Sequence, residues 1–95
     1  MSDVIDQAVK ALNEKDTSGF GDTAKFVIDG EGAIMLDDEG ARAGDEDATV
    51  TMMADADTFQ QILDGSINPT TAFMTGKLKV DGDMGAAMKL APLLG

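Results

Sequence analysis

The sequence INPTTAFMTGKLKVDGDMGAAMKL, residues 67–90, decides the fold of this chain, because a turn, a strand and a helix follow one another closely in it. Asn68-Pro69 marks the turn. Residues 77–81 then alternate polar and apolar side chains, as a strand with one buried face does. We therefore expect the last strand of the protein over 77–81.

A helix is expected directly after this strand, because Asp83 is a good N-cap residue. Its apolar positions recur at helical spacing and are Met84, Ala87, Met88 and Ala91. Pro92 has no N–H to donate, and it pushes the preceding residue away from helical geometry. The helix should therefore end by about Leu90, leaving Leu93 and Leu94 as a short apolar tail.

The first half of the chain favours short strands separated by glycines and acidic residues. Phe26 and Ile28 lie on one face of an alternating segment, and further strands are expected at residues 33–36, 41–44 and 49–53. Because the connections are short, we expect antiparallel hairpins with no helix crossing between the strands.

Two further helices are expected from apolar positions at helical spacing. The first has Ser2 as its N-cap, and its apolar positions are Val4, Ile5, Ala8, Val9 and Leu12. The second begins at Asp55 or Asp57 and stops at Gly65. Its apolar positions are Phe59, Ile62 and Leu63. The order helix, three or four strands, helix, strand, helix predicts an α+β domain.

The length of 95 residues predicts one domain over residues 1–95, and 43% apolar residues suffice for a small core. No run approaches the roughly 20 apolar residues of a membrane-spanning helix. The first residues lack the basic and apolar segments of a secretion signal, and the last lack a peroxisomal Ser-Lys-Leu-type address. Together with the absence of cysteine, these features favour a cytoplasmic protein.

The composition excludes several kinds of chemistry. With no His or Cys, the chain cannot form a Cys–His pair or a Ser–His–Asp triad by itself. Seven basic residues against 18 acidic ones, a net charge of −11, argue against a nucleic-acid partner. No pair of carboxylates stands out for acid–base catalysis, and the acidic turns do not fit an EF-hand calcium loop. We therefore expect a protein that is not an enzyme and needs no cofactor or metal.

The charge is unevenly distributed along the chain. Residues 1–64 carry a net charge of −12, and residues 65–95 carry +1. Acidic side chains concentrate at 37–39 and 45–47, where they are typical of solvated loops that keep sheet edges from associating. The last third of the chain is nearly neutral and apolar.

Methionine is frequent, with seven residues against four phenylalanines. Five of the methionines fall on expected apolar faces: Met35, Met52, Met74, Met84 and Met88. Methionine fills irregular space in a core, and it also lines cavities that adapt to flexible apolar ligands. The composition leaves both interpretations open.

The stretch over residues 67–90 also resembles the motif of the sterol carrier protein 2 family. The matching parts are Asn68-Pro69, Ala72-Phe73-Met74, Gly76-Lys77-Leu78-Lys79-Val80, Gly82-Asp83-Met84-Gly85 and Ala87-Met88-Lys89-Leu90. The resemblance continues upstream and covers most of residues 24–94. In its length the chain resembles a compact, free-standing member of the bacterial type.

The resemblance implies a five-stranded, largely antiparallel sheet covered by helices, with an apolar tunnel between sheet and helices. It also implies binding or transfer of sterols, fatty acids, fatty acyl-CoAs or phospholipids, and no catalytic residues. The positions that would line the tunnel are Phe26, Ile28, Val50, Met52, Phe59, Ile62, Phe73, Met74, Leu78, Met84 and Met88. Many relatives carry Gln where this chain has Thr75, so the polar contact near the tunnel differs here.

Two functions follow as hypotheses. One is a carrier for an apolar lipid, which would touch membranes transiently through the near-neutral region that bears Lys77, Lys79 and Lys89. Anionic membranes should repel the rest of a protein with this charge. The alternative is an accessory protein-interaction module on the same fold, with a collapsed tunnel.

Overall fold

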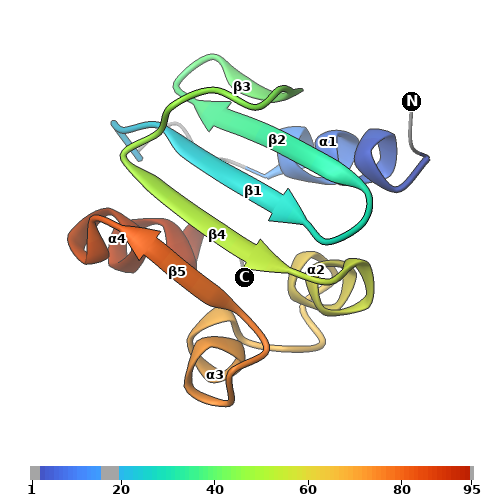
Figure 1. Ribbon diagram of the computed structural model, residues 1–95, viewed down its shortest axis with the longest axis vertical. Coiled ribbons are helices and arrows are strands. Elements are labelled where there is room, and N and C mark those ends of the chain that lie inside the picture. The colour runs from blue at the N-terminus through green and yellow to red at the C-terminus, as the bar shows by residue number, and fades with distance from the viewer. Residues whose placement is uncertain (1–2, 16–19, 95) are drawn as a thin grey trace.

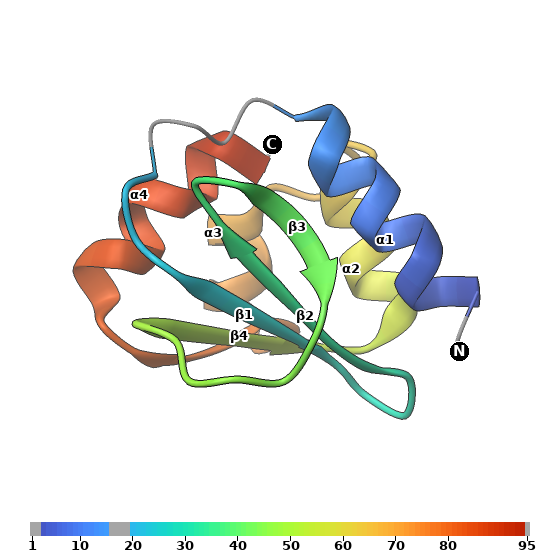
Figure 2. The same ribbon diagram turned by 90° about the horizontal axis from the view of Figure 1, so that it is seen from above.

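A computed structural model describes residues 3–15 and 20–94, which form a five-stranded sheet and four helices (Figure 1). In chain order the elements are α1 (Asp3–Glu14), β1 (Ala24–Ile28), β2 (Gly32–Asp37), β3 (Gly40–Ala43), β4 (Val50–Ala54), α2 (Ala56–Leu63), α3 (Pro69–Met74), β5 (Lys79–Gly82) and α4 (Met84–Leu94). All four helices lie on one side of the sheet (Figure 2). The predicted α+β architecture is confirmed, whereas Ser2 lies outside the described residues.

The strands follow the order β3-β2-β1-β4-β5, and three of the four neighbouring pairs are antiparallel. The pair β1–β4 is parallel, with Phe26 opposite Met52, so the expectation of antiparallel hairpins throughout is wrong for this pair. The reason is that two strands and a loop, rather than a helix, carry the chain from β1 to β4. The loop crosses the helix-free face, where Lys25 pairs with Asp45 at 2.9 Å and the Glu46 N–H donates to the Met35 sulfur at 3.4 Å.

Alternation along the strands separates the two faces of the sheet. Phe26, Val50 and Met52 point toward the helices and are buried, whereas their neighbours Lys25 and Thr51 are only partly buried. The Phe26 and Phe59 rings meet edge to face, with centroids 5.1 Å apart. The core therefore lies between β1, β4 and the helices. Met35 is also buried, but beneath the loop on the opposite face.

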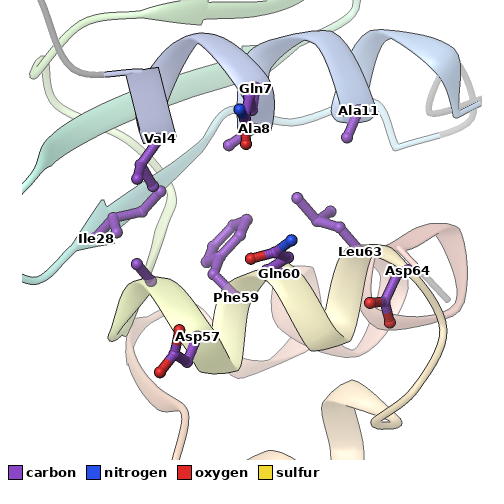
Figure 3. Close-up of a pocket in the computed structure, with 11 residues that line it drawn as sticks. Val4, Gln7, Ala8, Ala11, Ile28, Asp57, Phe59, Gln60, Leu63 and Asp64 are labelled. Carbon is purple, nitrogen blue, oxygen red and sulfur yellow. The ribbon is translucent and has the colours of Figure 1, made fainter.

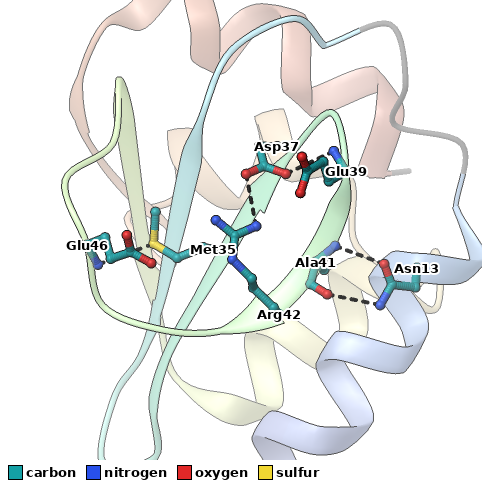
Figure 4. Close-up of polar contacts among 7 residues, drawn as sticks. All are labelled: Asn13, Met35, Asp37, Glu39, Ala41, Arg42 and Glu46. Atoms are coloured by element: carbon teal, nitrogen blue, oxygen red, sulfur yellow. Dashed lines mark hydrogen bonds and ion pairs between the residues drawn. The ribbon is translucent and has the colours of Figure 1, made fainter.

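The helix α1 is tied to the edge of the sheet through one amide side chain. Asn13 accepts a hydrogen bond from the Ala41 N–H at 2.8 Å and donates to the Ala41 carbonyl at 3.1 Å (Figure 4). These two bonds satisfy the outward backbone groups of β3 at this position, as a neighbouring strand would. One side of α1 thus lies against β3, and another side of the same helix faces α2.

The segment around Asn68 differs from the expected simple turn. The Asn68 side chain accepts from the Thr70 N–H at 2.8 Å, so it caps the short helix α3, and Pro69 occupies the first turn. The N–H groups of Lys77 and Leu78 both donate to the Ala72 carbonyl, which closes the end of this helix. These two residues consequently precede the last strand, which begins at Lys79 rather than at Lys77.

The last helix is longer than its proline suggests. Asp83 caps it as expected, accepting from the Gly85 N–H at 2.8 Å. The expected end near Leu90 is wrong, because α4 continues through Pro92 to Leu94. Pro92 removes only one backbone donor near the end of the helix, while Leu90 and Leu94, one turn apart, are both fully buried. Burial of Leu94 offsets the lost hydrogen bond.

Candidate functional site

A pocket of about 350 Å³ lies between α1 and α2 (Figure 3). We call it the α1–α2 pocket. Its apolar walls consist of Val4, Ala8, Ala11, Ile28, Ala56, Phe59 and Leu63. Its polar side chains are Gln7, Asp57, Gln60 and Asp64, all of them exposed. The pocket thus has an apolar interior beside a polar, solvent-facing rim, as sites for small amphipathic molecules do.

A second hollow lies on the other side of the core, between α3, α4 and the strands β4 and β5. It holds only about 50 Å³. Five of the predicted tunnel positions line it: Met52, Phe73, Leu78, Met84 and Met88. We call it the α3–α4 crevice.

The side chains around the α3–α4 crevice are unusually exposed for their type. Among the residues that the structure describes, the large apolar side chains classed as exposed are Phe73, Met74, Met84 and Met88, with exposed fractions of 42%, 79%, 46% and 69%. All four belong to α3 or α4. The prediction placed them inside a tunnel, but in this structure they surround the mouth of the crevice or, for Met74, point to solvent.

The remaining predicted tunnel positions are buried: Phe26, Ile28, Val50, Met52, Phe59, Ile62 and Leu78. Ile28 and Phe59 line the α1–α2 pocket, and Met52 and Leu78 line the crevice. The other three, Phe26, Val50 and Ile62, line neither hollow and pack in the core. The two hollows share no lining residue, so the predicted positions are distributed over two separate spaces.

Several residues of the α1–α2 pocket are absent from the predicted set, notably Val4, Ala8, Ala11, Gln60 and Leu63. The helical periodicity identified Val4, Ala8 and Leu63 as apolar, but only as core positions. The useful signal is side-chain size, because Ala8 and Ala11 lie on adjacent turns of α1 and leave room opposite α2. Small residues at a helix–helix contact are a source of empty space.

Hydrogen bonds hold two carboxylates of this region in their charged form. Asp55 caps α2, accepting from the Thr58 N–H at 2.7 Å, and the bonds to Thr58 lower the pKa of Asp55. The side-chain oxygen of Asp64 accepts from the Ser66 N–H at 2.9 Å, and the bonds to Ser66 lower the pKa of Asp64. Negative charge is therefore a fixed feature of both ends of α2.

Thr75, at the position of a polar contact near the tunnel in many relatives, and the lysines predicted to touch membranes lie in separate surroundings. The Thr75 hydroxyl donates to the carbonyls of α3, with the Thr71 oxygen at 3.0 Å. Lys89 pairs with Asp22 at 2.6 Å and lies over the Phe20 ring, 5.8 Å from its centroid. Lys79 neighbours Val80, which lines the crevice, so the alternation of β5 places Lys79 on the other face of the sheet. Lys77, Lys79 and Lys89 therefore do not form one cluster.

Within residues 3–15 and 20–94, no three acidic side chains come close enough together to hold a metal ion. None of the helices in the same ranges combines the length and the apolar character needed to cross a membrane.

Comparison with known proteins agrees with this architecture. The model of the SCP-2 sterol transfer family matches residues 4–95. The chain is 38% identical over 94 residues to hydroxysteroid dehydrogenase-like protein 2 of Xenopus laevis, a match covering 90% of this chain and 22% of that protein. It is 41% identical over 86 residues to sterol carrier protein 2 of Bos taurus, covering 87% of this chain and 14% of that protein. The chain therefore spans less than a quarter of the length of these relatives.

A solved structure shares the whole fold. It is the solution structure of sterol carrier protein 2 from Aedes aegypti in complex with palmitate, with a TM-score of 0.74 at 22% identity. The match covers 100% of this chain and 97% of that one. The family model matches nearly the entire sequence, including the motif over residues 67–90, and the chain therefore belongs to the SCP-2 sterol transfer family.

Proposed function

We propose that this protein is a non-catalytic carrier that binds one apolar lipid chain in the α1–α2 pocket. The observation that carries the proposal is the pocket itself, whose 350 Å³ lies within the range of about 300–1,000 Å³ typical of small-molecule sites. The driving force is burial of apolar surface, at roughly 0.8 kcal/mol for each buried CH₂ group. A long alkyl chain therefore needs few polar contacts in order to bind.

Membership of the family supports a lipid-binding role, and the fold neighbour from Aedes aegypti was solved with palmitate. Fatty acids, fatty acyl-CoAs, sterols and phospholipids are the candidate ligands. Three further points remain predictions. One lipid-binding domain spans residues 1–95, the protein is cytoplasmic, and it touches membranes transiently through Lys77, Lys79 and Lys89.

One observation favours the alternative, an accessory protein-interaction module with a collapsed tunnel. Phe26, Val50 and Ile62 were predicted to line the tunnel, but they line neither hollow and are at most 1% exposed. The methionines, however, are not interlocked as a collapsed tunnel would require, because Met35 is on the opposite face of the sheet and Met88 is exposed. We therefore favour the carrier.

The test is to identify lipid that co-purifies with the protein by native mass spectrometry, and then to titrate the delipidated protein with a fluorescent lipid. We expect saturable binding at one site per chain. The variant Ala11→Phe should fill the α1–α2 pocket and abolish this binding, whereas the matched variant Ala91→Phe fills the α3–α4 crevice and should leave it intact. Circular dichroism and urea midpoints verify that both variants are folded.

If no lipid co-purifies and no saturable binding is found, the carrier hypothesis is wrong and the protein-interaction module is favoured. Loss of binding in folded Ala91→Phe, with binding retained in folded Ala11→Phe, would move the ligand to the α3–α4 crevice.

A further inference from the structure

The large exposed apolar side chains of the described residues gather on two neighbouring helices. Phe73 and Met74 belong to α3, Met84 and Met88 belong to α4, and the two helices contact each other. Phe73, Met84 and Met88 also line the same crevice, so these three lie on one surface. We call the four side chains the α3–α4 apolar face. Large apolar side chains that gather on a surface mark a place where another molecule binds.

The two helices carry no acidic side chain, although the protein is strongly acidic. Neither α3 nor α4 contains Asp or Glu, and residues 65–95 contain only Asp81 and Asp83. The helices α1 and α2 differ in both respects, because each contains acidic residues and every exposed residue of either helix is polar. Among the described helices, only α3 and α4 therefore combine exposed apolar side chains with an absence of negative charge.

The shape of the α3–α4 apolar face fits a lipid bilayer better than a protein partner. Tight protein interfaces depend on side chains of one partner that fill pockets of the other. The α3–α4 crevice holds only about 50 Å³, whereas a cavity that binds benzene measures about 150 Å³. The face instead presents side chains that protrude. Methionine and phenylalanine on such a face can insert at the boundary between head groups and acyl chains.

We propose that α3 and α4 form a membrane-docking surface, on which Met74 and Met88 insert into the interfacial region of a zwitterionic phospholipid bilayer. Burial of apolar surface drives the insertion. A bilayer without net charge does not repel the net charge of −11, and the acidic loops stay in water. The α3–α4 crevice shares no lining residue with the α1–α2 pocket, so this inference goes beyond the proposed function and does not depend on it.

The first test is flotation of the whole, delipidated chain with phosphatidylcholine vesicles. We expect the wild-type protein to bind, and Met74→Gln and Met88→Gln each to bind roughly fivefold more weakly, because each removes apolar surface from the bilayer. Both positions are exposed, so the urea midpoints should stay close to that of the wild type. The matched control is Met53→Gln, which makes the same change on the helix-free face of the sheet and should float like the wild type.

The second test locates the contact with a single tryptophan, since the chain contains none. Brominated phosphatidylcholine should quench the emission of Met88→Trp strongly. It should leave the emission of Met53→Trp, on the opposite face of the sheet, and of Lys10→Trp, on α1, almost unchanged.

Three results would each overturn the docking surface: no flotation of the wild-type protein, an equal loss in all three glutamine variants, or stronger quenching of Lys10→Trp than of Met88→Trp. A protein partner would then be the remaining occupant of the α3–α4 apolar face. Ala11→Phe separates this surface from the proposed function, because it fills the α1–α2 pocket and should still float. Flotation without saturable lipid binding in solution would remove the carrier alone, and lipid binding without flotation would remove the docking surface alone.

Discussion

At the scale of single residues, Gly82 is the position where the backbone leaves no room for a side chain. Its φ is +100°, and a Cβ there would lie 2.6 Å from the Thr49 carbonyl oxygen and 3.2 Å from the Val50 Cα. This close approach exists because Gly82 pairs with Val50 in the sheet while the Asp83 N–H donates to Thr49. The glycine thus joins the edge strand β5 to the helix α4.

We expect Gly82→Ala to lower the free energy of unfolding by about 2–4 kcal/mol, through the positive φ and the backbone clash together. Gly65→Ala separates the two causes, because Gly65 also has a positive φ, +86°, but a Cβ there meets nothing within 4 Å. That control should cost only about 1–2 kcal/mol. Urea unfolding measures both, and equal losses would show that the contact with Thr49 does not matter.

At the scale of elements, the last turn of α4 depends on Leu94 although a proline precedes it. We expect Leu94→Ala to cost about 2–4 kcal/mol of unfolding free energy, because the side chain is 1% exposed and packs in the core. Leu93→Ala, one residue earlier on the same turn, should cost clearly less, since Leu93 is only partly buried. Thermal or urea unfolding provides the comparison. Two equally mild variants would mean that the helix ends before Pro92.

The elements also show which parts of the structure a sequence can predict. Long periodic patterns located α1, β4 and α2 within a residue or two, and Asp83 was identified as a cap. The helix α3 was missed because six residues are too few for a helical period, although Asn68-Pro69 is itself a capping pair. The parallel pairing of β1 with β4 depends on a path across the sheet that no local pattern records.

The candidate site was harder to predict for a related reason. The predicted set included Ile28 and Phe59, which line the α1–α2 pocket, but apolar character cannot distinguish a pocket wall from a filled core position such as Phe26. A pocket is space left between elements, so it depends on how α1 and α2 are placed relative to each other. Small residues such as Ala11 reveal that space only when the opposite element is known.

At the scale of the whole molecule, unbalanced charge governs how a carrier could approach a membrane. The described residues form three ion pairs, Lys25–Asp45, Arg42–Asp37 and Lys89–Asp22, against 18 acidic side chains in the sequence. Because seven basic residues cannot neutralise 18 acidic ones, the protein keeps a net charge of −11, and an anionic surface repels it over about one Debye length. Lys77 has no such ion pair with any described residue, and it follows α3, the helix that carries the exposed Phe73 and Met74.

We therefore expect transfer of a fluorescent lipid to phosphatidylcholine vesicles to be slowed when phosphatidylserine is added, and the slowing to diminish as salt is raised. Lys77→Gln should slow transfer further, because it removes positive charge where we predict contact. Lys10→Gln, on α1, makes the same change in net charge and is the matched control. An equal effect of both variants would assign the dependence to net charge alone. Faster transfer to phosphatidylserine vesicles would mean that a local basic contact outweighs the repulsion by the acidic loops.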